Sequence, residues 1–136
     1  MTTTTLPAWM PPVGGGVLVL PCGRDFDAVR VAGLTALQAV GRFPAGPPPL
    51  IEDQEQHVAS WLLPPGAAAT WLMPGTDALG QGANLAVPPA RWCSGPWTGG
   101  PAVRWLVPPA GDCLGDPAVL RSVLDAVLRG CGVRDA

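Results

Sequence analysis

The residues best suited to chemistry in this chain are two carboxylates, Asp25 and Asp27, which Phe26 separates. The stretch Phe26 to Val31 suits a strand, and residues two apart on a strand project from the same face. Two carboxylates held close together repel each other unless a cation lies between them, so this pattern is typical of a divalent-metal site. Asp77 or Asn84 is a candidate for a further oxygen ligand. A solvent-facing loop is the alternative interpretation of the same pair.

His57 is the only histidine, and it stands at the start of the apolar stretch His57 to Leu63. A histidine at the start of a strand is either a surface residue or a catalytic group, and the sequence leaves both open. The polar run before it, which contains Glu52, Asp53 and Glu55, is expected to form a solvated turn.

Two pairs of neighbours match the needs of single-stranded nucleic-acid binding, in which aromatic rings stack on bases and cations follow the phosphates. These pairs are Arg91 with Trp92 and Arg104 with Trp105. The simpler interpretation of six tryptophans in a small domain is that they fill its core.

The composition limits the class of protein. A chain of 136 residues forms one domain, and 48% hydrophobic with 13% charged residues indicates a globular chain despite 18 Gly and 18 Pro. Lysine is absent, and 8 basic against 10 acidic residues leave a net charge of -2. Nucleic-acid binding is therefore expected to be weak at most, because such binding needs a basic track.

Targeting signals are not evident in the sequence. No apolar run approaches the roughly 20 residues of a membrane span, and the N-terminal stretch lacks the positive region of a signal peptide. The protein is therefore expected to be cytoplasmic, with no membrane association. In that compartment the four cysteines are expected to be free thiols without zinc, because no close ligand pair exists among Cys22, Cys93, Cys113 and Cys131. We expect no cofactor.

The periodicities predict an α+β fold, a mostly antiparallel sheet of four to six strands with two helices packed on it. Residues 1–12 are expected to be a flexible tail, and residues 13–136 the single domain. One helix is expected at 32–41, with Leu34, Leu37 and Val40 spaced three apart, and another at 117–129. The second begins at Asp116 and Pro117, a good N-cap and first position. Four apolar runs that end at prolines are expected to be strands: Val17 to Leu20, His57 to Leu63, Asn84 to Val87 and Ala102 to Val107. The stretch Phe26 to Val31 is expected to extend or follow the first of them.

Four segments together resemble the N-terminal domain of bifunctional DNA primase/polymerases, an archaeo-eukaryotic primase-like family with short actinobacterial forms. The segments are Cys22 to Val31, Gln56 to Pro64, Asp77 to Pro89 and Val103 to Pro108. The first resembles the family's first acidic segment, and the second resembles its strand that starts with a catalytic His. The third resembles the family's stretch in which an Asp precedes a Gly-rich turn and a strand ending in Pro-Pro. The fourth resembles the strand that follows this stretch.

This resemblance implies a two-metal nucleotidyl transferase. Asp25, Asp27 and Asp77 would hold Mg²⁺ or Mn²⁺, and His57 would contact the incoming nucleotide. Such an enzyme would act in DNA replication of a mobile element.

The chain also departs from the family pattern. In a second possible register Arg30 stands at a metal-binding position, where a cation would repel the metal. Little precedes Val17 where the family has a segment of its nucleotide pocket. We therefore expect a shortened, non-catalytic accessory or interaction module with a protein partner or a homodimer. The metal-dependent transferase remains the alternative.

Overall fold

The structure is a computed structural model that describes residues 7–12, 14–93, 102–109 and 114–132. This part of the chain has an α+β fold with two α-helices and seven strands in two antiparallel sheets. The helices are α1 (Gly33–Ala39) and α2 (Pro117–Gly132), and short 3₁₀ helices occupy Val40–Arg42 (η1) and Ala67–Thr70 (η2). The strands are β1 (Leu18–Pro21), β2 (Asp27–Ala32), β3 (Leu50–Asp53), β4 (Val58–Leu63), β5 (Asp77–Leu79), β6 (Asn84–Val87) and β7 (Val103–Val107).

The larger sheet has the strand order β5-β2-β4-β3-β7, and all its neighbours are antiparallel. Its centre is β4, which pairs along its whole length with β2, from Asp27 opposite Leu63 to Ala32 opposite Val58. A tight turn joins β3 to β4, and the Asp53 side chain closes it by accepting hydrogen bonds from the amides of Glu55 and Gln56. The predicted α+β class with a mostly antiparallel sheet is confirmed.

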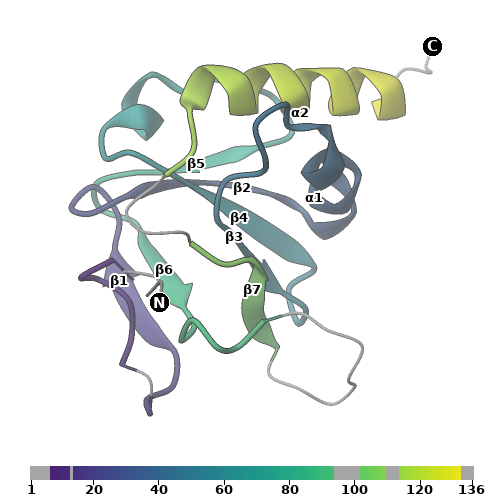
Figure 1. Cartoon of the computed structure of the whole chain (residues 1–136). Coiled ribbons are helices and arrows are strands. Elements are labelled where there is room, and N and C mark those ends of the chain that lie inside the picture. The colour runs from purple at the N-terminus through teal and green to yellow at the C-terminus, as the bar shows by residue number, and fades with distance from the viewer. Residues whose placement is uncertain (1–6, 13, 94–101, 110–113, 133–136) are drawn as a thin grey trace.

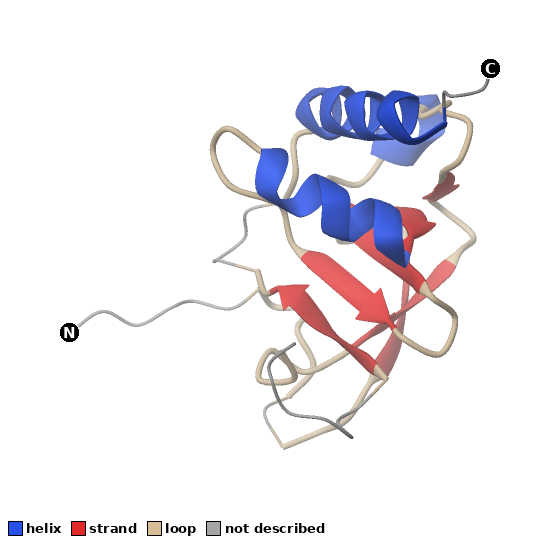
Figure 2. Cartoon of the chain, turned by 90° about the vertical axis from the view of Figure 1, so that its right-hand side faces the viewer, coloured by secondary structure: helices blue, strands red, loops and turns tan. Residues whose placement is uncertain are grey.

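Both helices cover one face of this sheet, as Figures 1 and 2 show. They bury an upper core on the sheet, which consists of Val29, Val31, Ala36, Ala39, Leu50, Ala59, Trp61, Leu63, Trp71, Leu120, Val123, Leu124 and Val127. The periodicity of α2 predicts that Leu120, Leu124 and Leu128 face the sheet. Leu120 and Leu124 are fully buried, whereas Leu128 is half-buried.

Helix α1 buries a different face from the expected one. The sequence indicated Leu34 and Leu37 as its apolar positions, but these side chains are 69% and 53% exposed. Ala36 and Ala39 are buried instead. Both alanines are 0% exposed, so a larger side chain at either position would have to displace its neighbours in the close-packed core.

The opposite face of the large sheet is covered by the two-stranded sheet of β1 and β6 (Figure 1). The two enclose a lower core, which consists of Cys22, Phe26, Ala28, Ile51, Leu62, Leu85, Val87 and Trp105. Trp9 extends this core, with ring centroids 5.0 Å from Phe26 and 6.5 Å from Trp105. The expectation of a flexible tail is therefore wrong for residues 7–12, because Pro7 and Pro11 are buried and Trp9 packs on the core.

Three further expectations are corrected. Strand β1 forms where predicted, but its apolar run, which is typical of a buried strand, is largely exposed, with Val19 at 68%. Glu52 lies on strand β3 rather than in a solvated turn, and its carboxylate pairs with Arg104 at 3.3 Å. Short strand β5 forms at Asp77, where the sequence showed no apolar run. None of the helices among the described residues has the length and apolar character that a membrane span needs.

Candidate functional site

Asp27 is a buried acidic residue whose carboxylate binds backbone amides. It is the first residue of β2, and only 1% of its surface is exposed. Its Oδ2 accepts hydrogen bonds from the backbone amides of Gly66 at 2.8 Å and Ala68 at 2.9 Å. These bonds tie the turn after β4 and the start of η2 to the sheet. Oδ1 has no hydrogen-bond partner among the described residues.

A cavity of about 360 Å³ adjoins this carboxylate. We call it the Asp27 cavity, and its lining consists of Gly23, Asp27, Gly66, Ala68, Ala69, Ala78, Gly80 and Gln81. Small residues keep it open: a Cβ on Gly80 would lie 3.7 Å from Asp27 Oδ2 and 3.0 Å from the Cβ of Ala68.

The other two candidate metal ligands do not join Asp27. Asp25 precedes β2, in the segment between β1 and β2, and is exposed. Asp77 pairs across the ladder with Arg30. Because side chains alternate along a strand and cross-strand partners share a face, Asp77 projects from the face opposite to that of Asp27. Within the described ranges, no group of three His, Cys, Asp or Glu side chains is placed to hold a metal ion. The three carboxylates therefore do not fit the metal pair that the resemblance implies.

His57 lies at the far end of the sheet from Asp27. Asp27 pairs with the last residue of β4, whereas His57 immediately precedes its first. Five steps along a strand separate the two ends, which is roughly 17 Å. His57 is exposed and has a φ of 58°, and its carbonyl accepts a hydrogen bond from the amide of Gly33 at 2.9 Å. It therefore serves as a left-handed turn residue between β3 and β4.

The candidate nucleic-acid residues do not form one basic surface. Arg104 is 8% exposed, and its Nε donates to Glu52 Oε1 on the neighbouring strand. Arg91 is exposed, and Trp92 is half-buried. Trp105 is fully buried in the lower core, where its Nε1 donates to the carbonyl of Pro88 at 2.9 Å. The cation and ring of the Arg104–Trp105 pair are thus both used inside the fold.

Two of the four predicted free thiols lie among residues whose side chains are described, and both are free. Cys22 is buried, and burial first, then the charge of Asp27, raises its pKa to about 11 although Arg30 acts in the opposite sense. Cys93 is half-buried, and its thiol donates to the carbonyl of Ala90 at 3.2 Å. The side chains of Cys113 and Cys131, like that of Trp97, lie outside the described residues.

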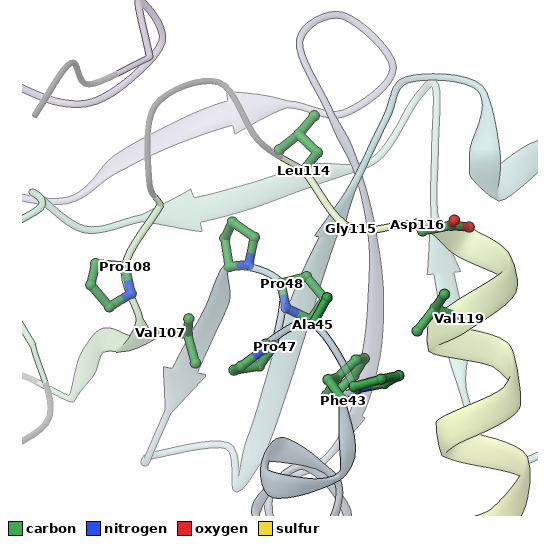
Figure 3. Close-up of a pocket in the computed structure, with 13 residues that line it drawn as sticks. Phe43, Ala45, Pro47, Pro48, Val107, Pro108, Leu114, Gly115, Asp116 and Val119 are labelled. Carbon is green, nitrogen blue, oxygen red and sulfur yellow. The ribbon is translucent and has the colours of Figure 1, made fainter.

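A second cavity, of about 500 Å³, lies between the proline-rich segment 43–49 and the N-terminal end of α2 (Figure 3). Its walls are mostly apolar and include Phe43, Pro48 and Val119. Its one carboxylate, Asp116, already accepts a hydrogen bond from the amide of Ala118 through Oδ1. This arrangement offers apolar contact but no set of groups for proton transfer or metal binding.

The sequence singled out Asp27 as a candidate metal ligand, and in the structure its Oδ2 accepts hydrogen bonds from two backbone amides. The backbone amides that it binds lie 39 and 41 residues away. The signal that points to such a role is the Pro-Pro-Gly turn after β4, in which only Gly66 has a backbone N–H, because the prolines have none, and this N–H needs an acceptor. Searches with protein-family models, among curated proteins and among solved structures found no match to this chain.

Proposed function

We propose that this protein is a small non-catalytic interaction module, acting in the cytoplasm, with a fold related to that of primase/polymerase N-terminal domains. The observation that carries this proposal is the apolar surface of edge strand β1. Leu18 and Val19 of β1 are 42% and 68% exposed, and Val17, which directly precedes the strand, is 38% exposed. Soluble proteins usually protect an edge strand with charges, prolines or covering segments.

The pairing of β1 supports a role in association. It pairs with β6 on one side, and in the part of the chain that the structure describes no other strand pairs with it. Residues 17–20 carry no charge. A second copy of the chain can therefore pair its own β1 in antiparallel register, which would join the two small sheets and cover these side chains. The occupant we propose is a second copy, in a symmetric homodimer.

The test is the mass in solution. We expect a concentration-dependent dimer by light scattering, and we expect Val19→Lys to shift it to the monomer, because a lysine on an edge strand opposes pairing. Leu72→Lys is the matched control, since Leu72 is 82% exposed and lies outside β1. A wild-type monomer at high concentration, or equal effects of the two variants, would contradict the proposal.

The alternative, a metal-dependent nucleotidyl transferase, is tested separately. The separation of Asp27 from Asp77 and His57 supports the absence of template-directed incorporation, and the net charge of -2 supports weak, salt-sensitive binding to single-stranded DNA. Primer extension by the wild-type chain with Mg²⁺ or Mn²⁺, lost in Asp27→Ala and His57→Ala, would replace the non-catalytic assignment by the enzyme.

A further inference from the structure

The N-terminal arm, residues 7–12, is attached to the domain through side-chain packing. Trp9 packs at the end of the lower core, and its ring centroid lies 5.0 Å from that of Phe26. Within the arm, the amide of Met10 donates to the carbonyl of Pro7 at 3.1 Å. Among the described residues, no hydrogen bond joins the arm to the strands or the helices. The arm can therefore leave its site without breaking a backbone ladder.

Three consecutive glycines, residues 14–16, lie between the arm and β1. Glycine has the greatest backbone freedom of all residues, and a Cβ on Gly14 would meet no atom within 4 Å. This segment is therefore a hinge. Pro11 and Pro12 stiffen the arm just before it, because each ring fixes φ. A stiff arm on a short hinge is an arrangement that invites exchange of the arm between two copies.

We propose that the arm is exchanged between the two copies of the dimer, so that Trp9 of each copy fills the lower core of the other. This exchange rests on the dimer proposed above and adds a second contact to the pairing of β1. The occupant is a second copy because Trp9 already fits this site, 5.0 Å from Phe26 and 6.5 Å from Trp105 between ring centroids. The same ring contacts form whether the arm comes from one copy or from the other.

The geometry of β1 favours the exchange. The amide of Gly23 donates to the carbonyl of Phe26 at 2.8 Å, so the site of Trp9 lies just beyond the last residue of β1. The arm joins β1 at the other end, before Leu18, and three steps along a strand separate the two ends by roughly 10 Å. Within one copy, the chain must run back past the whole strand to reach its own site.

Pairing of β1 with its copy removes this detour. When two copies of a strand pair in antiparallel register about their centre, the first residue of one lies opposite the last residue of the other. Leu18 of one copy then lies opposite Pro21 of the other, next to the segment that holds Phe26. The arm of each copy thus begins beside the site of its partner.

The first experiment locates the arm directly. Equal amounts of ¹³C-labelled and unlabelled full chain are unfolded together and refolded, so that mixed dimers form. Isotope-filtered NOE spectra then select contacts between copies. We expect NOEs between the ring of Trp9 in one copy and the ring of Phe26 in the other. Trp9→Ala should remove these signals, which confirms their assignment.

Two hinge variants test the exchange by mass. Deletion of Gly14 and Gly15 leaves too little chain for the arm to run back along its own strand, so we expect the dissociation constant of the dimer to fall at least about tenfold. Insertion of two glycines after Gly16 is the matched control, and a longer hinge should raise this constant. Both variants keep Trp9 and β1 unchanged.

The outcomes distinguish the exchange from the dimer itself. A dimer whose NOEs between Trp9 and Phe26 arise only within one copy overturns the exchange and leaves the pairing of β1 in place. The same holds if the deletion variant dimerises no more tightly than the insertion variant. A wild-type chain that stays monomeric at high concentration overturns both, and its mass identifies this case before any NOE is measured.

Discussion

The packing of α2 on the sheet provides the sharpest test of the fold. Leu124 is fully buried in the upper core. Leu124→Ala removes roughly three buried methylene equivalents, which is about 2.4 kcal/mol of transfer free energy. The cavity that remains adds up to about 2 kcal/mol when the surroundings do not collapse. We therefore expect the free energy of unfolding to fall by about 2.5–4.5 kcal/mol, a large part of the roughly 5–15 kcal/mol of a typical domain.

Urea unfolding followed by tryptophan fluorescence measures this loss, because Trp61 and Trp71 lie in the same core. The midpoint should fall while the m-value stays constant, and the thermal midpoint should drop by roughly 10–20 °C. Leu72→Ala is the matched control, since an 82% exposed side chain should cost less than about 0.5 kcal/mol. A Leu124→Ala protein within about 0.5 kcal/mol of wild type would refute the packing of α2 described here.

Further predictions concern α1 and the thiols. Leu37→Ser should change stability by less than about 0.5 kcal/mol, whereas Ala36→Leu should cost about 1–3 kcal/mol or more by overpacking; equal costs in urea unfolding would contradict the observed orientation of α1. Because burial raises the pKa of Cys22 from 9.0 to about 11, its thiolate at pH 8 should be roughly a hundredfold scarcer than that of an ordinary thiol. Iodoacetamide labelling followed by mass spectrometry should therefore modify Cys22 far more slowly than an unfolded control, and equal rates would refute its burial. The raised pKa also makes the free energy of unfolding fall as the pH rises from about 9 to about 11, because the unfolded chain releases the Cys22 proton at lower pH than the folded chain does. If the free energy of unfolding of wild type instead rose over this range relative to that of Cys22→Ala, the direction of the pKa shift would be wrong.

The two cavities differ in what they offer a ligand. The Asp27 cavity has a buried charge and small walls. The cavity beside α2 is mostly apolar, and its only carboxylate already caps the helix.

Local patterns were sufficient for α2 and for five of the strands, but not for β3 and β5. The stripe of Leu120 and Leu124 has helical period, and Asp116 accepts the amide of Ala118 as an N-cap does. Strands β4, β6 and β7 end directly before Pro-Pro, because proline cannot donate to a ladder. These features depend on residues within one turn or one strand, so the sequence alone predicts them.

The tertiary structure decided what each element faces and which polar groups meet. Trp61 and Trp105 stand in nearly identical segments, yet they enter the upper and the lower core respectively. The backbone amides that bind Asp27 lie 39 and 41 residues away along the chain. Asp77 lies opposite Arg30 on the neighbouring strand, on the other face of the sheet from Asp27. Strand order and register determine these contacts, and they come from packing over the whole chain rather than from local spacing.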